Sequence, residues 1–217
     1  MEPSASNIEI RASDVTLHGS LGLPDGAVGL VVFAHGSGSS RFSPRNRMVA
    51  RTLREAGLGT LLFDLLTDDE ERIDAVTREL RFDIAFLAER LVAVTRWLIE
   101  EQGITIPFGY FGASTGAAAA LLAAAEGPSV RAVVSRGGRP DLAGDALERV
   151  RAPTLLIVGG NDFVVLDLNR AALERLHCEK KLVIVPGATH LFEERGALEQ
   201  VAAEARDWYR THFGAGG

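Results

Sequence analysis

The sequence predicts an α/β fold with a mainly parallel sheet and helices on both of its faces. Six short apolar runs alternate with longer amphipathic or alanine-rich stretches along the chain. Runs that are apolar throughout are typical of strands buried on both faces, and strands that alternate with helices indicate parallel pairing through right-handed crossovers. The length of 217 residues suits one domain with a sizeable core. We therefore expect a single domain over residues 1–217.

The elements can be placed along the chain in order. Residues 8–23 alternate and contain turn formers at Ser13-Asp14 and His18-Gly19, which predicts an antiparallel N-terminal hairpin. The apolar runs predict strands at residues 29–34, 58–63, 107–111, 130–135, 154–158 and 182–185. Helices are expected at residues 45–56, 83–101, 114–126, 166–176 and 197–212. The acidic stretch 64–81 predicts a solvated loop, and residues 214–217 predict a disordered tail.

Charge and composition exclude several classes of partner. The net charge of −6 argues against a nucleic-acid binder, which needs a concentrated positive surface. No apolar run approaches the ~18 residues of a membrane span, and residues 1–7 lack the features of a signal peptide. The single cysteine, Cys178, excludes an intrachain disulfide and fits a reducing compartment. We expect a soluble, cytoplasmic protein that binds neither nucleic acid nor membrane.

A serine stands between two glycines where an expected strand turns into an expected helix. The segment is Gly112-Ala113-Ser114-Thr115-Gly116, directly after the apolar run 107–111. In a G-x-S-x-G turn of this kind the serine has strained dihedrals, and the glycines prevent clashes between strand and helix. The hydroxyl then projects from the carboxyl edge of the sheet at a helix N-terminus. We predict that Ser114 is a nucleophile rather than part of a structural turn.

A serine hydroxyl needs a neighbouring base, and His190 is the best placed of the five histidines. It lies after the last expected strand and before the last expected helix. His35 is a rival because it also follows a strand, but it belongs to a glycine-rich loop that has another role. The other histidines are expected at the surface: His18, His177 and His212.

The base needs an orienting acid, for which Asp162 is the first choice. It follows the expected strand 154–158, 48 residues after Ser114 (162 − 114) and 28 before His190 (190 − 162). The order Ser, Asp, His is that of the serine hydrolases with the G-x-S-x-G turn. A helix cap is the structural alternative for Asp162. Asp167, within an expected helix, and Asp64, after an earlier strand, are weaker candidates.

The developing oxyanion needs preorganised donors, usually backbone amides. The glycine-rich loop 34–40, Ala34-His35-Gly36-Ser37-Gly38-Ser39-Ser40, follows the first buried strand. We predict one donor amide at Ser37 and the other at Thr115, directly after the nucleophile. The loop matches neither G-x-G-x-x-G nor the P-loop, and no His/Cys/Asp/Glu cluster has zinc spacing. No metal and no cofactor are expected.

Arginines gather beside the expected strand ends. Arg41 follows the oxyanion loop, and Arg136 and Arg139 follow the strand 130–135 in a glycine-containing loop. The carboxyl edge of the strands is where ligands bind in open α/β folds. We hypothesise that these three side chains bind an anionic group of the substrate. Structural pairing with carboxylates is the alternative for each of them.

Four motifs together resemble the α/β-hydrolase superfamily and, within it, the dienelactone hydrolase-related serine hydrolases. They are Phe33-Ala34-His35-Gly36-Ser37-Gly38, Gly112-Ala113-Ser114-Thr115-Gly116, Leu156-Ile157-Val158-Gly159-Gly160-Asn161-Asp162 and Gly187-Ala188-Thr189-His190. The resemblance runs from about residue 30 to residue 213. It implies an α/β-hydrolase fold with Ser114 as nucleophile, Asp162 as acid and His190 as base. Similar domains occur alone or fused to a phosphoribosyltransferase domain.

Two features of the chain narrow what the resemblance implies. Dienelactone hydrolase itself is similar but has cysteine at the position of Ser114, so ordinary esters are expected in place of dienelactone. Only 18 residues, 136 to 153, separate two successive strands where many relatives insert a lid domain. A site without a large lid favours small or accessible esters over long-chain lipids.

The expected function is hydrolysis of carboxylic esters through an acyl-enzyme. The partner is then a small-molecule ester, and the protein is a monomer or a homodimer. One alternative is another acyl chemistry on the same triad: a thioesterase, a peptidase or an acyltransferase. The second alternative is a non-catalytic binding module, which has no need of an intact Ser, Asp and His.

Overall fold

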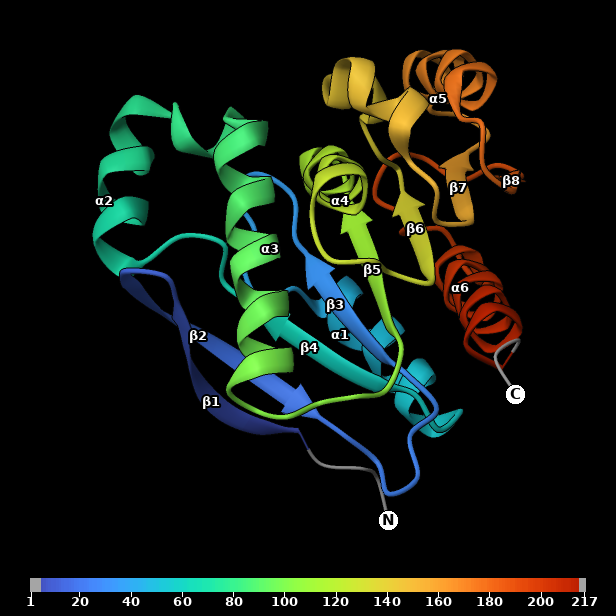
Figure 1. Cartoon of the computed structure of the whole chain (residues 1–217). Helices are drawn as coiled ribbons and strands as arrows, with labels where there is room; N and C mark the ends of the chain where they lie inside the picture. Colours follow the sequence, from blue (N-terminus) through green and yellow to red (C-terminus); the bar gives the residue numbers. More distant parts are fainter. Residues whose placement is uncertain (1–4, 215–217) are drawn as a thin grey trace.

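One eight-stranded sheet organises the chain, whose computed structural model describes residues 5–214 (Figure 1). The strands are β1 (Ser6–Ala12), β2 (Val15–Gly22), β3 (Leu30–Ala34), β4 (Gly59–Phe63), β5 (Phe108–Ala113), β6 (Ala132–Arg136), β7 (Thr154–Gly159) and β8 (Lys180–Val185). Their spatial order is β1-β2-β4-β3-β5-β6-β7-β8. The six strands from β3 to β8 are parallel, and their residues are buried almost throughout except in the edge strand β8. The predicted mainly parallel sheet is confirmed.

The N-terminal hairpin is also confirmed, with one correction. Strand β1 pairs antiparallel with β2, in a register that joins Ala12 to Val15 across a turn at Ser13-Asp14. Ser13 has a positive φ of 58°, which suits this tight turn. The second expected turn, His18-Gly19, lies inside β2. A Cβ on Gly19 would come within 2.8 Å of the Ile10 side chain, so the glycine serves close packing and not chain reversal.

Helices cover both faces of the sheet. They are α1 (Pro44–Glu55), α2 (Asp68–Thr77), α3 (Ile84–Glu100), α4 (Thr115–Glu126), α5 (Phe163–Arg175) and α6 (Ala197–Gly214), with 3-10 segments η1 (Leu80–Phe82) and η2 (Pro140–Arg149). Side chains of α3, α4 and α5 pack with one face, and those of α1 and α6 pack with the other. Figure 1 shows α3 in front of the sheet and α1 behind it. Gly214 ends α6, and the rest of the expected tail lies outside the described residues.

The expectation of an irregular loop over residues 64–81 was wrong, because this stretch contains α2 and η1. Thr67 and Glu70 form a reciprocal capping box at the start of α2, and Arg78 ends it in the left-handed conformation. The buried carboxylate of Asp74 accepts a hydrogen bond from Nε of Arg81 at 2.5 Å. Glu70 pairs with Arg90 on α3. The helix is therefore held by polar contacts, which a hydrophobic pattern does not reveal.

The strand order places the site at one edge of the sheet. The chain moves outward from β3 to β4 and then returns to β5 on the other side of β3. The loops after β3 and β5 therefore leave the sheet at the point where the strand order reverses. Crevices at such switch points are where ligands bind in open α/β sheets. The loop 34–40 and Ser114 both lie at this point.

Candidate active site

Ser114 has a backbone conformation that residues other than glycine rarely adopt. It lies between β5 and α4 with φ 52° and ψ −122°. A Cβ on Gly112 would collide with the backbone of Ala117, and one on Gly116 would collide with the carbonyl oxygen of Ala34. Both glycines are therefore required sterically, as the turn motif predicts. Strain of this kind is found mainly where the surrounding structure holds a functional side chain in position.

The backbone of Ser114 is tied to the loop that follows β6. Its amide donates to the carbonyl oxygen of Arg136 at 3.3 Å. Its own carbonyl oxygen accepts from the amides of Ala117 and Arg139, both at 3.1 Å. The strained turn is thus fixed by α4 on one side and by the loop 136–139 on the other.

His190 and Asp162 are joined directly. The distance between Nδ1 of His190 and Oδ2 of Asp162 is 2.6 Å, and the two side chains are 39% and 15% exposed. Asp162 occupies the N-cap position of α5, yet its side chain makes no capping hydrogen bond. The helix-cap alternative does not describe this carboxylate, because it accepts a hydrogen bond from an imidazole instead.

Hydrogen bonds from backbone and side-chain groups hold the loop that carries His190. Asn161 donates from its amide to Ala188 and from its side chain to Gly187, each at 2.9 Å. The carboxylate of Glu194 accepts from the amide of Thr189 at 3.0 Å and from its hydroxyl at 2.6 Å. The Thr189 hydroxyl is the main cause that lowers the pKa of Glu194. These contacts join positions that no local sequence pattern links, and the sequence did not point to them.

Ser114 and His190 meet the same short loop. A Cβ on Gly137 would lie 3.2 Å from the carbonyl oxygen of His190 and 3.6 Å from its ring atom Cε1. Gly137 follows Arg136, whose carbonyl oxygen binds the amide of Ser114. Among the hydrogen bonds of residues 5–214, none joins Oγ of Ser114 to His190. Such contacts often tighten only when a substrate is bound.

The weaker acid candidates have other partners. Asp167 lies in α5, where its exposed carboxylate pairs with Arg170 at 3.0 Å. Asp64 follows β4 and accepts from the amide of Arg41 at 2.7 Å as well as from the guanidinium of the same residue. Of the three aspartates considered, Asp162 is the one that binds His190.

His35 has a structural role in the glycine-rich loop. Its Nε2 accepts a hydrogen bond from the amide of Leu65 at 3.1 Å, so the ring proton must be on Nδ1. Nδ1 then donates to the carbonyl oxygen of Gly36 at 3.0 Å. Burial lowers the pKa of His35, which also favours the neutral ring. This histidine fixes the loop and has no free nitrogen to act as a base.

The predicted oxyanion donors contact each other. The amide of Ser37 donates to Oγ1 of Thr115 at 3.0 Å across 78 positions of sequence. The glycine-rich loop therefore lies against the first residue of α4. The Thr115 hydroxyl occupies the acceptor position at the Ser37 amide, where an oxyanion would also have to bind. The sequence placed both residues at this edge but did not indicate the side-chain contact.

The three arginines differ in their partners. Arg41 pairs with Asp64, and its guanidinium lies 4.2 Å from the centre of the Phe42 ring. Arg139 binds both carboxylate oxygens of Asp141 at 2.9 Å and 2.8 Å. Both therefore have the structural pairing that was the alternative to substrate binding. Arg136 is buried and, among the described residues, has no ion pair.

Exposed apolar side chains follow Asp162 and His190 directly in the sequence. Phe163 and Val164 follow Asp162 and are 69% and 74% exposed, and Leu191 follows His190 and is 40% exposed. The hollow beside the glycine-rich loop measures only about 30 Å³. Segment η2 spans the 136–153 connection, so a loop and a short helical segment stand where a lid would be inserted. These three side chains are exposed apolar surface next in the chain to the two residues of the pair.

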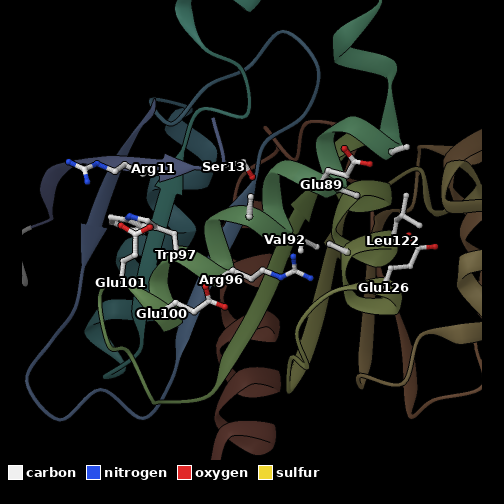
Figure 2. Close-up of a pocket in the computed structure, with 14 residues that line it drawn as sticks. Arg11, Ser13, Glu89, Val92, Arg96, Trp97, Glu100, Glu101, Leu122 and Glu126 are labelled. Atoms are coloured by element: carbon white, nitrogen blue, oxygen red, sulfur yellow. The ribbon is translucent and has the colours of Figure 1, made fainter. Parts of the chain in front are cut away.

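A larger groove lies away from these residues. It has a volume of about 590 Å³ and is lined by α3, the end of α4 and the hairpin. Figure 2 shows Trp97 extending from α3 towards Arg11, and Arg96 extending to the other side towards Glu126. None of the predicted catalytic residues lines it. No nucleophile, base and acid converge there.

Two features are absent from residues 5–214. No group of three or more histidine, cysteine, aspartate or glutamate side chains in this part of the chain could hold a metal ion. No helix described in it is long and apolar enough to cross a membrane.

The fold and the placement of the strained serine at the switch point are those of an α/β hydrolase. The chain belongs to the dienelactone hydrolase family, whose model matches residues 17–213. A crystal structure of dienelactone hydrolase from Anabaena variabilis is 57% identical, with a TM-score of 0.95, over 98% of this chain and 99% of that one. A serine hydrolase without lid from Xanthomonas campestris shares the fold at 22% identity, with a TM-score of 0.76 over 97% and 96% of the two chains.

Curated relatives from Mycobacterium tuberculosis are longer. They carry the name "Putative phosphoribosyl transferase" and are 58% identical over 208 residues. The match covers 95% of this chain but 46% of those proteins. The chain thus spans less than half the length of the curated relatives it matches, and their name describes proteins with a further region.

Proposed function

We propose that the protein hydrolyses carboxylic esters through an acyl-enzyme formed on Ser114. The observation that carries this proposal is the 2.6 Å contact between His190 and Asp162, beside the loop that also fixes Ser114. An aspartate that binds Nδ1 leaves Nε2 of the imidazole as the free base. The family and the esterase-like fold of its relatives support a hydrolase.

The mechanism follows from these positions. Nε2 of His190 accepts the proton of the Ser114 hydroxyl while Oγ attacks the carbonyl carbon. Asp162 stabilises the imidazolium that forms, and the amide of Thr115 donates to the oxyanion. The amide of Ser37 donates to Oγ1 of Thr115 in the free protein and joins the oxyanion hole when the oxyanion replaces that hydroxyl as its acceptor. His190 then gives the proton to the leaving alcohol, which departs and leaves the acyl group on Ser114. Water, activated by the same histidine, releases the acid and restores the serine.

The surroundings favour small or accessible esters. Phe163, Val164 and Leu191, which follow Asp162 and His190 in the chain, are exposed apolar side chains that could contact a substrate without enclosing it. We expect simple esters because this chain has Ser114 where dienelactone hydrolase has a cysteine nucleophile. The 57% identity to a protein named dienelactone hydrolase makes a dienelactone the informative second substrate.

The test is hydrolysis of p-nitrophenyl acetate by the full chain and by Ser114→Ala. We expect the variant to lose about three orders of magnitude or more in kcat. A fluorophosphonate probe should label the wild-type protein and not the variant, which separates a catalyst from a binding module. Turnover by Ser114→Ala at the wild-type rate would refute the assignment. Comparison of matched esters, thioesters and amides then distinguishes ester hydrolysis from the related acyl chemistries.

A further inference from the structure

Arg136 is a buried cation that has no counter-charge within the described part of the chain, residues 5–214. It is 8% exposed, and its Nε and Nη1 have no hydrogen-bond partner. Burial, followed by the charge of Arg45, lowers the pKa of Arg136 to about 10, so the side chain is still protonated at neutral pH. Other inward-facing arginines of the described chain are paired: Arg81 with Asp74, and Arg90 with Glu70.

An uncompensated guanidinium is unfavourable inside a protein. Removing a charge from water is strongly unfavourable unless an opposite charge and hydrogen bonds replace the solvent. Buried groups without partners are few in folded proteins, and each calls for an explanation. Arg136 therefore indicates a partner that residues 5–214 do not supply.

The position of Arg136 places that partner next to the candidate nucleophile. The residue ends β6, opposite Ala113 in the register with β5, and its carbonyl oxygen accepts from the amide of Ser114. The guanidinium is therefore attached to a backbone position next to the turn that carries Ser114. The remaining 8% of the surface of Arg136 faces solvent.

The neighbouring charges are also positive. Arg45 stands in the first turn of α1, which contains no acidic residue, and a helix N-terminus attracts anions. The partner of Arg45 is Glu193, at 3.4 Å and with a side chain that is 67% exposed. An exposed ion pair of this length is weak, so it compensates little of the local positive charge.

We propose that Arg136, supported by Arg45 and the N-terminus of α1, binds an oxyanion, a carboxylate or a phosphate, beside Ser114. The anion has two possible sources: the non-reacting end of the ester substrate, or a free ion that supports the active-site loops. The first source rests on the proposed function, and the second does not. In both cases a planar guanidinium suits the chemistry, because it can bind two oxygens of such a group.

The first arm of the test uses two esters with acyl chains of equal length, p-nitrophenyl butyrate and mono-p-nitrophenyl succinate. They differ only in whether the chain ends in a methyl group or a carboxylate. If the anion is part of the substrate, Arg136→Gln lowers the ratio of kcat/KM for succinate to that for butyrate by about tenfold or more. Arg136→Lys should retain part of the ratio, because the charge remains.

Arg139→Gln is the matched control. Arg139 lies in the same loop, but its guanidinium is already bound by Asp141. This substitution should leave the succinate-to-butyrate ratio unchanged. If Arg136→Gln does not fold, Arg45→Gln provides a second reduction of charge at the site and should lower the ratio in the same direction.

The second arm uses inorganic phosphate and measures the midpoint of thermal unfolding. If a free ion is the partner, phosphate raises the midpoint of the wild-type protein in a saturable way, and Arg136→Gln abolishes the effect. An unchanged ester ratio together with an unchanged phosphate response in Arg136→Gln would overturn the inference. Failure of the proposed esterase function would give a different result: the wild-type protein would not hydrolyse the neutral ester, p-nitrophenyl butyrate.

Discussion

Asp162 begins helix α5, but its carboxylate accepts a hydrogen bond from His190 and caps no amide of the helix. An aspartate at this position normally accepts from the amides of the first turn. The side chain instead binds a residue 28 positions later in the chain, over 2.6 Å. The helix end gives up a local hydrogen bond, which is understandable if the carboxylate is needed to orient the imidazole.

The first prediction concerns this pair. Asp162→Asn should lower kcat for p-nitrophenyl acetate by about three to four orders of magnitude, because an amide does not hold the imidazole in the same tautomer. The thermal midpoint should change little, since Asp162 does not cap α5. Asp167→Asn is the matched control, on the same helix but paired with Arg170 at the surface. Equal rates for the two variants would show that Asp162 is not the acid.

The sequence could predict this part of the site because local chemistry specifies it. Short apolar runs mark the strands, and parallel strands bring their carboxyl ends to one edge, which is enough to gather Ser114, Asp162 and His190 there. Glycines beside Ser114 have a steric reason that is also local. The order Ser114, Asp162, His190 along the chain led to Asp162 as the partner of His190, and the structure shows a hydrogen bond between these two side chains.

The second prediction uses the strain at Ser114. Its φ of 52° and ψ of −122° resemble those of Gly144, at 54° and −134°. Ser114→Gly should therefore stabilise the fold by about 1 kcal/mol, because glycine reaches this conformation without a steric penalty. Ser114→Ala retains a Cβ and should show no such gain. Both variants should be inactive, and chemical denaturation measures the difference in the free energy of unfolding.

Other contacts could not be predicted because they join distant residues through side chains. The hydrogen bond from Ser37 to Thr115 depends on how the loop after β3 lies against α4. The helix α2 depends on buried ion pairs, and its pattern is too acidic to indicate a core-facing side. Its capping residues, Thr67 and Glu70, were the local signal available. The lack of a partner for Arg136 likewise appears only in three dimensions.

The third prediction tests the contact between the two expected oxyanion donors. Thr115→Val removes the hydroxyl that accepts from the amide of Ser37 and keeps the shape of the side chain. If that hydroxyl positions the amide, kcat should fall by roughly fivefold, the worth of one hydrogen bond. Thr115→Ser keeps the hydroxyl and should retain most of the activity. A faster Thr115→Val variant would indicate instead that the hydroxyl competes with the oxyanion.

The last prediction is a dependence of stability on pH at α2. Burial alone would raise the pKa of Asp74, but hydrogen bonds from the amide and guanidinium of Arg81 outweigh it, and the net pKa is lowered. A carboxylate with a lowered pKa in the folded state contributes stability above its unfolded value, about 3.9. This contribution is lost as the pH falls through the folded value.

Asp74→Asn should therefore be less stable than the wild-type protein at pH 7, by about 2 kcal/mol, and the difference should shrink as the pH falls below about 5. The midpoints of thermal unfolding of the variant and the wild-type protein, measured from pH 7 to pH 3, show both the difference at pH 7 and its decrease at low pH. Asp69→Asn is the control on the same helix, because Asp69 pairs with Arg72 at the surface with a side chain that is 81% exposed. If Asp74→Asn and the wild-type protein lost stability in parallel over this range, the pairing with Arg81 would not be what stabilises α2 and the segment that follows it.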